Sequence, residues 1–280
     1  MKILSNILIW VFAVLLTCTV LIYQRMTGPT YPQRESMEIA GKTTDYKLLR
    51  SWAKEKEPGK QSTIPLLEFS GQKPDGFLAR CEFRKNNTGD DWTTIEMIPE
   101  GDKMIAILPT QPPAGKLAYS IILYNSDSEF VLTETPVVIR FKDYIPGWIP
   151  LPHVLLIFVS LLFSTMAAVE ALRRGNKVRI YALLAAVSML IGGLIMGPFM
   201  QKYAFGEWWT GWPWGSDLTD TKTMAAFFVW VIAYIVLRVN PKNRFWPVFA
   251  AIVTLGVFVI PHSLLGSEFD YSAGEVVTGR

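Results

Sequence analysis

The sequence predicts an α-helical membrane protein with an all-β domain inserted after its first helix. Half of the 280 residues are hydrophobic and the mean hydropathy is +0.26, which is more apolar than an ordinary soluble chain. Long apolar runs follow one another with short loops between them, except for one polar stretch over residues 31–145. These observations predict five transmembrane helices and one large domain outside the bilayer.

Crossing a bilayer core of roughly 30 Å takes about 20 helical residues at 1.5 Å per residue. Five apolar runs are long enough: Ile3 to Tyr23, Ile149 to Leu172, Val178 to Met200, Leu218 to Val239 and Phe245 to Leu265. No small-residue cleavage site follows the first run, so we expect residues 1–25 to be an uncleaved anchor. The other four runs predict a four-helix transmembrane domain over residues 149–265 and an extracytoplasmic tail, residues 266–280.

The charged loops predict the orientation of these helices, because short cytoplasmic loops collect Lys and Arg. Two loops carry basic residues and no acid: Arg173, Arg174, Lys177 and Arg179 after the second run, and Arg238, Lys242 and Arg244 after the fourth. Both loops are therefore expected in the cytoplasm. The N-terminus then lies inside, and the polar region, the loop after the third run and the C-terminus lie outside.

Residues 31–145 predict an antiparallel β sandwich on the extracytoplasmic side. Phe77, Ala79, Cys81 and Phe83 alternate with polar or exposed positions, and so do Leu117, Tyr119, Ile121 and Leu123. This period of two is that of strands with one buried face. Turn-forming segments separate several such short strands, as in a sandwich. Acidic and basic residues nearly balance in this region, which argues against a nucleic-acid partner.

Trp92, Met97, the Ile107 to Pro109 segment and the following PPAGKLAYSI resemble the second half of immunoglobulin-like and fibronectin-type modules. The resemblance covers about 60 residues. It implies an immunoglobulin-like sandwich in which a tyrosine late in the domain precedes the closing strands.

Small residues in the third apolar run predict close helix packing. They form the spacings Ser188-x-x-x-Gly192 and Gly193-x-x-x-Gly197, which let helix backbones approach in a bilayer. No Asp, Glu, Lys or Arg lies in the middle of any run. Since proton relays and ion pathways need ionisable groups at depth, this favours a passive partner over a pump or coupled transporter.

The chain's only histidines lie near the predicted outer ends of two helices. His153 is close to the start of the second run and His262 close to the end of the fifth, so antiparallel helices would bring them level. Two histidines on facing helices match the axial ligands of a b-type haem. The loop GEWWTGWPWGSDLTDTKT would then supply the walls, and residues beside the ligands His153 and His262 would be Trp209, Trp212 and Lys202.

Two other interpretations of this region remain open. Tryptophans at a membrane boundary form the ordinary aromatic belt, and a histidine there is often only hydrogen bonded. Alternatively, the two histidines would hold a metal that activates water, as in a metal-assisted hydrolase, together with the acids of the loop and the tail, Asp217, Asp220, Glu268 and Asp270. For Asp217 and Asp220 we favour a simpler role, since their spacing is that of a capping box at a helix start.

The tail HSLLGSEFDYSAGEV resembles the final segment of four-helix, b-type-cytochrome-like membrane proteins, although those carry more histidines. The layout of anchor, sandwich and four helices with a GWPWGSDLTDTKT loop resembles a family of bacterial inner-membrane proteins that has no assigned activity to transfer. The first hypothesis is therefore a haem b electron-transfer subunit with an extracytoplasmic docking domain. The alternative is a non-enzymatic assembly subunit whose sandwich binds an exported protein. Both partners would be membrane or extracytoplasmic proteins, and neither hypothesis makes the chain an independent enzyme.

Overall fold

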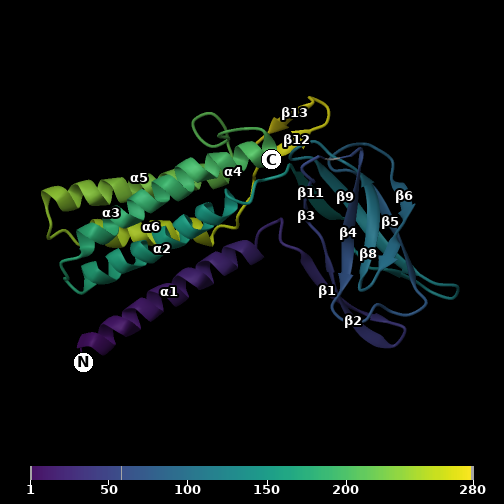
Figure 1. The fold of residues 1–280 in the computed structure, drawn as a ribbon, viewed down its shortest axis with the longest axis horizontal. Coiled ribbons are helices and arrows are strands. Elements are labelled where there is room, and N and C mark those ends of the chain that lie inside the picture. Colours follow the sequence, from purple (N-terminus) through teal and green to yellow (C-terminus); the bar gives the residue numbers. More distant parts are fainter. Residues whose placement is uncertain (1, 58, 279–280) are drawn as a thin grey trace. The chain divides into compact units, whose positions relative to one another are not determined.

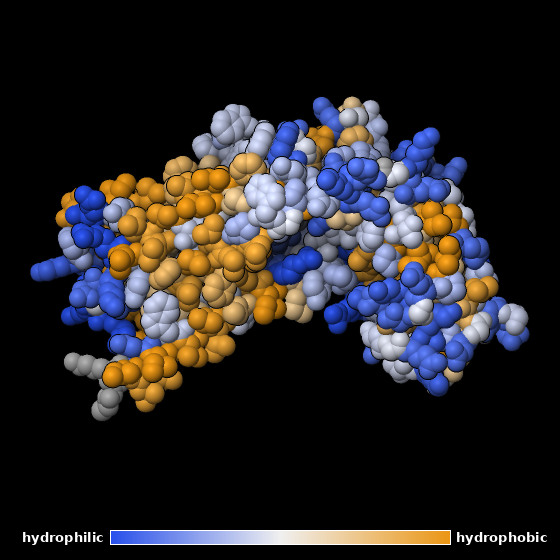
Figure 2. All heavy atoms as spheres, viewed as in Figure 1, coloured by the Kyte–Doolittle hydropathy of each residue, from blue (hydrophilic) through white to orange (hydrophobic). Residues whose placement is uncertain are grey.

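The computed structural model describes residues 2–57 and 59–278, which divide into two compact units (Figure 1). The helical unit contains residues 2–29, 145–267 and 278, and the β unit contains Thr30–Tyr144 and Glu268–Val277. Apolar side chains cover the helices, whereas polar side chains dominate the visible surface of the strands (Figure 2). Each unit therefore has the surface that the sequence predicts for it.

Of the five spans that the sequence predicts, four correspond to helices long and apolar enough to cross a membrane within the described part of the chain. They are Ile3–Met26 within α1 (Lys2–Met26), α2 (Pro150–Leu172), Val178–Phe205 and α5 (Leu218–Val239). The third is one continuous helix made of α3 (Val178–Met189), a π-helical turn η1 (Leu190–Ile195) and α4 (Met196–Phe205). The chain thus has the helices of an integral membrane protein.

The last helix, α6, is shorter than the sequence predicts. It spans Phe245–Val259, 15 residues, or about 22 Å at the α-helical rise. The prediction of a helix reaching Leu265 is wrong because of Pro261: a residue before proline is driven to extended backbone, and Ile260 has ψ 126°. As a consequence His262 lies beyond the helix instead of inside it.

The small residues of η1 allow the close packing that the sequence predicts. A β carbon on Gly192 would lie 2.6 Å from Leu156 Cβ of α2, and one on Gly193 would lie 2.6 Å from Thr223 Cγ2 of α5. Gly197 has open space around the same position, so it takes no part in this packing. Neighbouring backbones therefore approach at η1.

The β unit is a sandwich of two sheets. One has the order β1-β2-β4-β8-β7, and the other has the order β3-β11-β9-β5-β6, with β10 also paired to β9. The strands are β1 (Gln33–Ile39), β2 (Lys42–Leu48), β3 (Ser51–Ala53), β4 (Gln61–Phe69), β5 (Leu78–Lys85), β6 (Thr93–Glu96), β7 (Ile98–Glu100), β8 (Lys103–Pro109), β9 (Lys116–Tyr124), β10 (Glu129–Val131) and β11 (Val137–Lys142). The residues predicted to face inward on β5 and β9 are buried in its core, with Phe77 just before β5.

A hairpin from the C-terminal end of the chain completes the β unit. Its strands are β12 (Glu268–Asp270) and β13 (Glu275–Val277). The Glu268 carboxylate, in a residue that is only 7% exposed, lies 2.7 Å from Lys116 Nζ. The Phe269 N–H donates to the Ala114 carbonyl, and the Tyr271 hydroxyl donates to Gln111 Oε1 at 2.8 Å. The segment predicted as a tail is thus folded against the sandwich.

Candidate functional site

His153 is held by the π-helical turn. Its Nδ1 lies 2.8 Å from the Gly192 carbonyl oxygen. In an α-helix that carbonyl would accept from the Met196 N–H, but here Met196 donates to Ile191 instead, as a wider turn requires. Because a carbonyl only accepts, Nδ1 carries the proton and Nε2 has the free lone pair. The histidine therefore donates a hydrogen bond to the Gly192 carbonyl, which the π-helical turn leaves without its α-helical donor.

His262 lies in the turn after α6, and its side chain is exposed. Its backbone N–H donates to the Gln24 carbonyl near the end of α1, at 3.4 Å. The structure thus positions His153 against η1, whereas His262 lies beside α1. The prediction that the two imidazoles face each other assumed that both histidines lie inside helices. For His262 this assumption is wrong, because α6 ends at Val259.

Two of the other predicted cofactor contacts, Trp209 and Lys202, donate hydrogen bonds to backbone carbonyls of their own segment. Trp209 Nε1 donates to the carbonyls of Gly211 and Trp212, at 3.0 and 3.1 Å. Lys202 Nζ donates to the carbonyl of Gly206 at 2.6 Å, where the left-handed Gly206 ends α4. A basic side chain at that position stabilises the last carbonyls of a helix. These residues build the loop after α4.

Acidic residues at the start of α5 fix this loop, residues 206–217, which we call the tryptophan loop. Asp217 accepts from the Thr219 N–H at 2.8 Å, so the predicted capping of α5 is confirmed. Asp220 accepts from the backbone N–H of Thr210 at 2.9 Å and from its hydroxyl at 3.2 Å. The capping box itself is not closed, because the Asp217 N–H donates to the Thr210 carbonyl instead.

Two glycines allow the tryptophan loop to pack tightly, one against α5 and one against the loop's own backbone. A β carbon on Gly211 would lie 2.6 Å from Asp220 Cβ, and one on Gly215 would lie 2.2 Å from the Thr210 carbonyl oxygen. Between them, Trp212 and Trp214 point away from this tight packing and are 62% and 83% exposed. The result is a tied loop that displays two indoles.

Two polar side chains, Gln201 and Lys222, connect elements at this end of the helical unit. Gln201 Nε2 donates to the hydroxyls of Thr210 and Ser267, both at 2.8 Å. Lys222, only 6% exposed, donates to the carbonyls of Ile260 and Pro261 at 2.8 and 3.3 Å. Lys222 thereby stabilises the end of α6. Neither the contact of Lys222 with Ile260 nor that of Gln201 with Ser267 has a sequence signal, because each joins residues far apart in the chain.

Exposed aromatic side chains continue from the tryptophan loop along α4. The ring of Phe199 contacts Trp208 and Trp148, with centroids 5.2 and 6.3 Å apart, and Trp148 also contacts Tyr203. Trp208 and Trp148 are 51% and 58% exposed. This end of the helical unit therefore carries a row of accessible rings, as an aromatic belt or a contact surface would.

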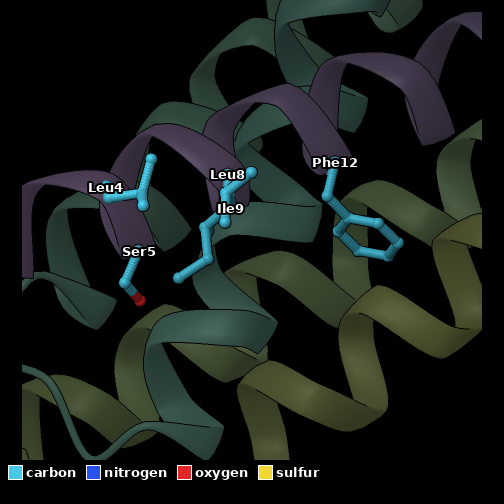
Figure 3. A pocket seen from close by; sticks show the side chains of 5 residues that line it. All are labelled: Leu4, Ser5, Leu8, Ile9 and Phe12. Carbon is cyan, nitrogen blue, oxygen red and sulfur yellow. The ribbon is translucent and has the colours of Figure 1, made fainter. Parts of the chain in front are cut away.

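A groove of about 410 Å³ runs along α1, far along the chain from these residues (Figure 3). Its lining is apolar apart from one hydroxyl: Leu4, Ser5, Leu8, Ile9 and Phe12. It has no group for acid-base or metal chemistry. Among the described residues, no three His, Cys, Asp or Glu side chains gather as metal ligands would, so the acidic metal site considered from the sequence has no geometric support.

Comparison with known proteins adds no identity. No protein-family model, no curated protein and no solved structure matches the chain. The geometry of the tryptophan loop is therefore the basis on which a function is proposed.

Proposed function

We propose that this chain is a non-enzymatic interaction or assembly subunit of a membrane complex. One observation carries the proposal: the tryptophan loop is fixed by Asp217, Asp220 and two glycines while it displays Trp212 and Trp214. Rigid, exposed tryptophans are the side chains that contribute most to protein interfaces. A fixed loop also loses little conformational entropy when a partner binds.

For the membrane topology we propose five spans, with the N-terminus inside and the C-terminus outside. Support comes from the β unit, since Thr30–Tyr144 and Glu268–Val277 fold together and must share one side. The chain between them then crosses an even number of times. α2, Val178–Phe205 and α5 account for three crossings, so α6 would make the fourth. A short span is accommodated by local thinning of the bilayer.

We propose the bacterial inner membrane as the location, with the β unit in the extracytoplasmic space. The basic loops after α2 and α5 support this orientation. The β unit has a strand order that supports an immunoglobulin-like class. β2-β4-β8-β7 corresponds to strands A-B-E-D, and β11-β9-β5 corresponds to G-F-C. The sandwich would bind the exported partner, and the tryptophan loop would be a contact surface of its own on the helical unit.

Affinity purification of the full chain after cross-linking in native membranes tests the interaction. We expect the Trp212→Ala, Trp214→Ala double variant to lose partners that the wild type retains. Trp148→Ala is the control, because Trp148 is 58% exposed, close to the 62% of Trp212, and lies outside the loop. Identical partners for the double variant and the wild type would rule out the loop as the contact surface.

A haem b electron-transfer subunit is the second candidate. It is favoured by His153, whose Nδ1 contact with Gly192 leaves Nε2 available as a ligand, in the arrangement typical of metal-bound histidines. An absorbance spectrum of protein expressed with haem tests it, and a missing Soret band would exclude it. The variant His153→Gln retains a donor for Gly192 but removes the imidazole, so under the interaction proposal it leaves partner binding unchanged.

A further inference from the structure

The sandwich has one long open edge. Four described strands lie at the edges of the two sheets. β3 and β7 have three residues and β6 has four, whereas β1 has seven. β7 also contains Pro99, which has no N–H to donate. Most side chains of β1 are exposed. An edge strand of this length presents a row of backbone N–H and C=O groups that a further strand can pair with.

The sequence of β1 is complementary to itself in the antiparallel direction. Ser36 is its central residue, and Arg34 and Glu38 lie two positions to either side on the same face. If a second β1 is paired about a two-fold axis at Ser36, all seven residues overlap. Arg34 of each copy then lies opposite Glu38 of the other. Opposite charges at directly facing positions stabilise a strand pair, while like charges destabilise it.

The second face of β1 is compatible with the same register. Glu35 would lie opposite Met37 of the second copy, and Gln33 opposite Ile39, so no like charges face each other directly. Ile39 is buried, and Met37 packs against the core of the sandwich. Gln33 and Glu35 are hydrogen bonded to each other at 3.0 Å. The added strand would therefore extend an existing core instead of burying an unpaired charge.

We propose that two copies of this chain associate through β1, antiparallel and centred on Ser36, which joins their five-stranded sheets into one. β-strand addition supplies the backbone hydrogen bonds, and the Arg34 to Glu38 pairs set the register. β1 begins at Gln33, soon after α1 ends at Met26. Copies anchored in one bilayer therefore meet at a raised effective concentration. This association is separate from the partner contact proposed for the tryptophan loop.

Disulfide trapping of the full chain in proteoliposomes tests the pairing, in a Cys18→Ser background. Facing residues of an antiparallel pair have Cα atoms about 4.5 to 5.5 Å apart, within the range that a disulfide bridges. Ser36→Cys should therefore form a covalent dimer on mild oxidation. Thr43→Cys is the control, since it is exposed on the next strand inward. Equal yields at the two positions would mean random collision and would overturn the proposal.

Charge reversal tests the register with the same readout. Arg34→Glu and Glu38→Arg each create two like-charge pairs per dimer and should weaken dimerisation by roughly tenfold. The double variant restores opposite charges and should recover the wild-type yield of the Ser36→Cys disulfide. A double variant that stays as low as the single variants would overturn the proposed register. A chain that remains monomeric in the bilayer would overturn the pairing itself and leave the edge to a strand of another protein.

Discussion

Replacing Asp220 by Ala should loosen the tryptophan loop without unfolding the helices. The carboxylate accepts from the backbone N–H and the hydroxyl of Thr210, and each hydrogen bond to a charged group contributes about 1.5 to 3 kcal/mol. Asp217 also lies within 3.3 Å of that hydroxyl, so removing Asp220 relieves some repulsion between the acids. The Thr210 hydroxyl can still donate to Asp217, so only the bond to the Thr210 N–H is fully lost, and we expect a cost of about 2 kcal/mol for loop closure.

Hydrogen exchange measures this cost directly. The Thr210 amide is protected by Asp220, and a loss of about 2 kcal/mol corresponds to roughly 30-fold faster exchange if local opening limits it. Thr219→Ala is the matched control, because the Thr219 hydroxyl has no hydrogen-bond partner and lies on the same turn of α5. If exchange over residues 208–216 were as slow in Asp220→Ala as in the control, the carboxylate would not be what fixes the loop.

Three further predictions concern other parts of the chain. Lys222→Met leaves the Ile260 and Pro261 carbonyls without their shared donor, so amide exchange at the end of α6 should rise by about tenfold; unchanged exchange would show that the lysine does not stabilise α6. Glu268→Ala removes the partner of Lys116 and should make residues 268–277 sensitive to limited proteolysis, with Glu275→Ala, exposed on the same hairpin, as the resistant control. Burial raises the pKa of the Cys81 thiol to about 12, so a maleimide at pH 8 should label it only after unfolding; rapid labelling of the folded protein, read by mass spectrometry, would contradict its position in the core.

Side-chain alternation was sufficient to predict the two central strands of the β unit. Tyr119, Ile121 and Leu123 are fully buried, as their period of two requires. The capping role of Asp217 was equally predictable from the sequence, because an N-cap depends on one residue and its own backbone neighbours. Features of this kind are local, so a sequence contains them completely.

The two histidines show where sequence analysis fails. The apolar run from Phe245 continues to Leu265, but Pro261 within it forces the preceding residue out of the helix, a signal that hydropathy and run length do not register. The π-helical turn is also invisible in composition, although it decides what His153 contacts. Likewise, only the folded chain brings Glu268 to Lys116, because that ion pair depends on tertiary contacts between distant segments.

The hairpin that completes the β unit also sets an order of events during synthesis. Glu268 follows Lys116 by 152 residues, so at elongation rates of about 5 to 20 residues per second the lysine is synthesised roughly 8 to 30 seconds before the glutamate. Throughout that interval the β unit lacks its last two strands while the ribosome is still synthesising the helices. The sandwich can be completed only after the last helix has been translated. Its completion is therefore a late step in the folding of the whole chain.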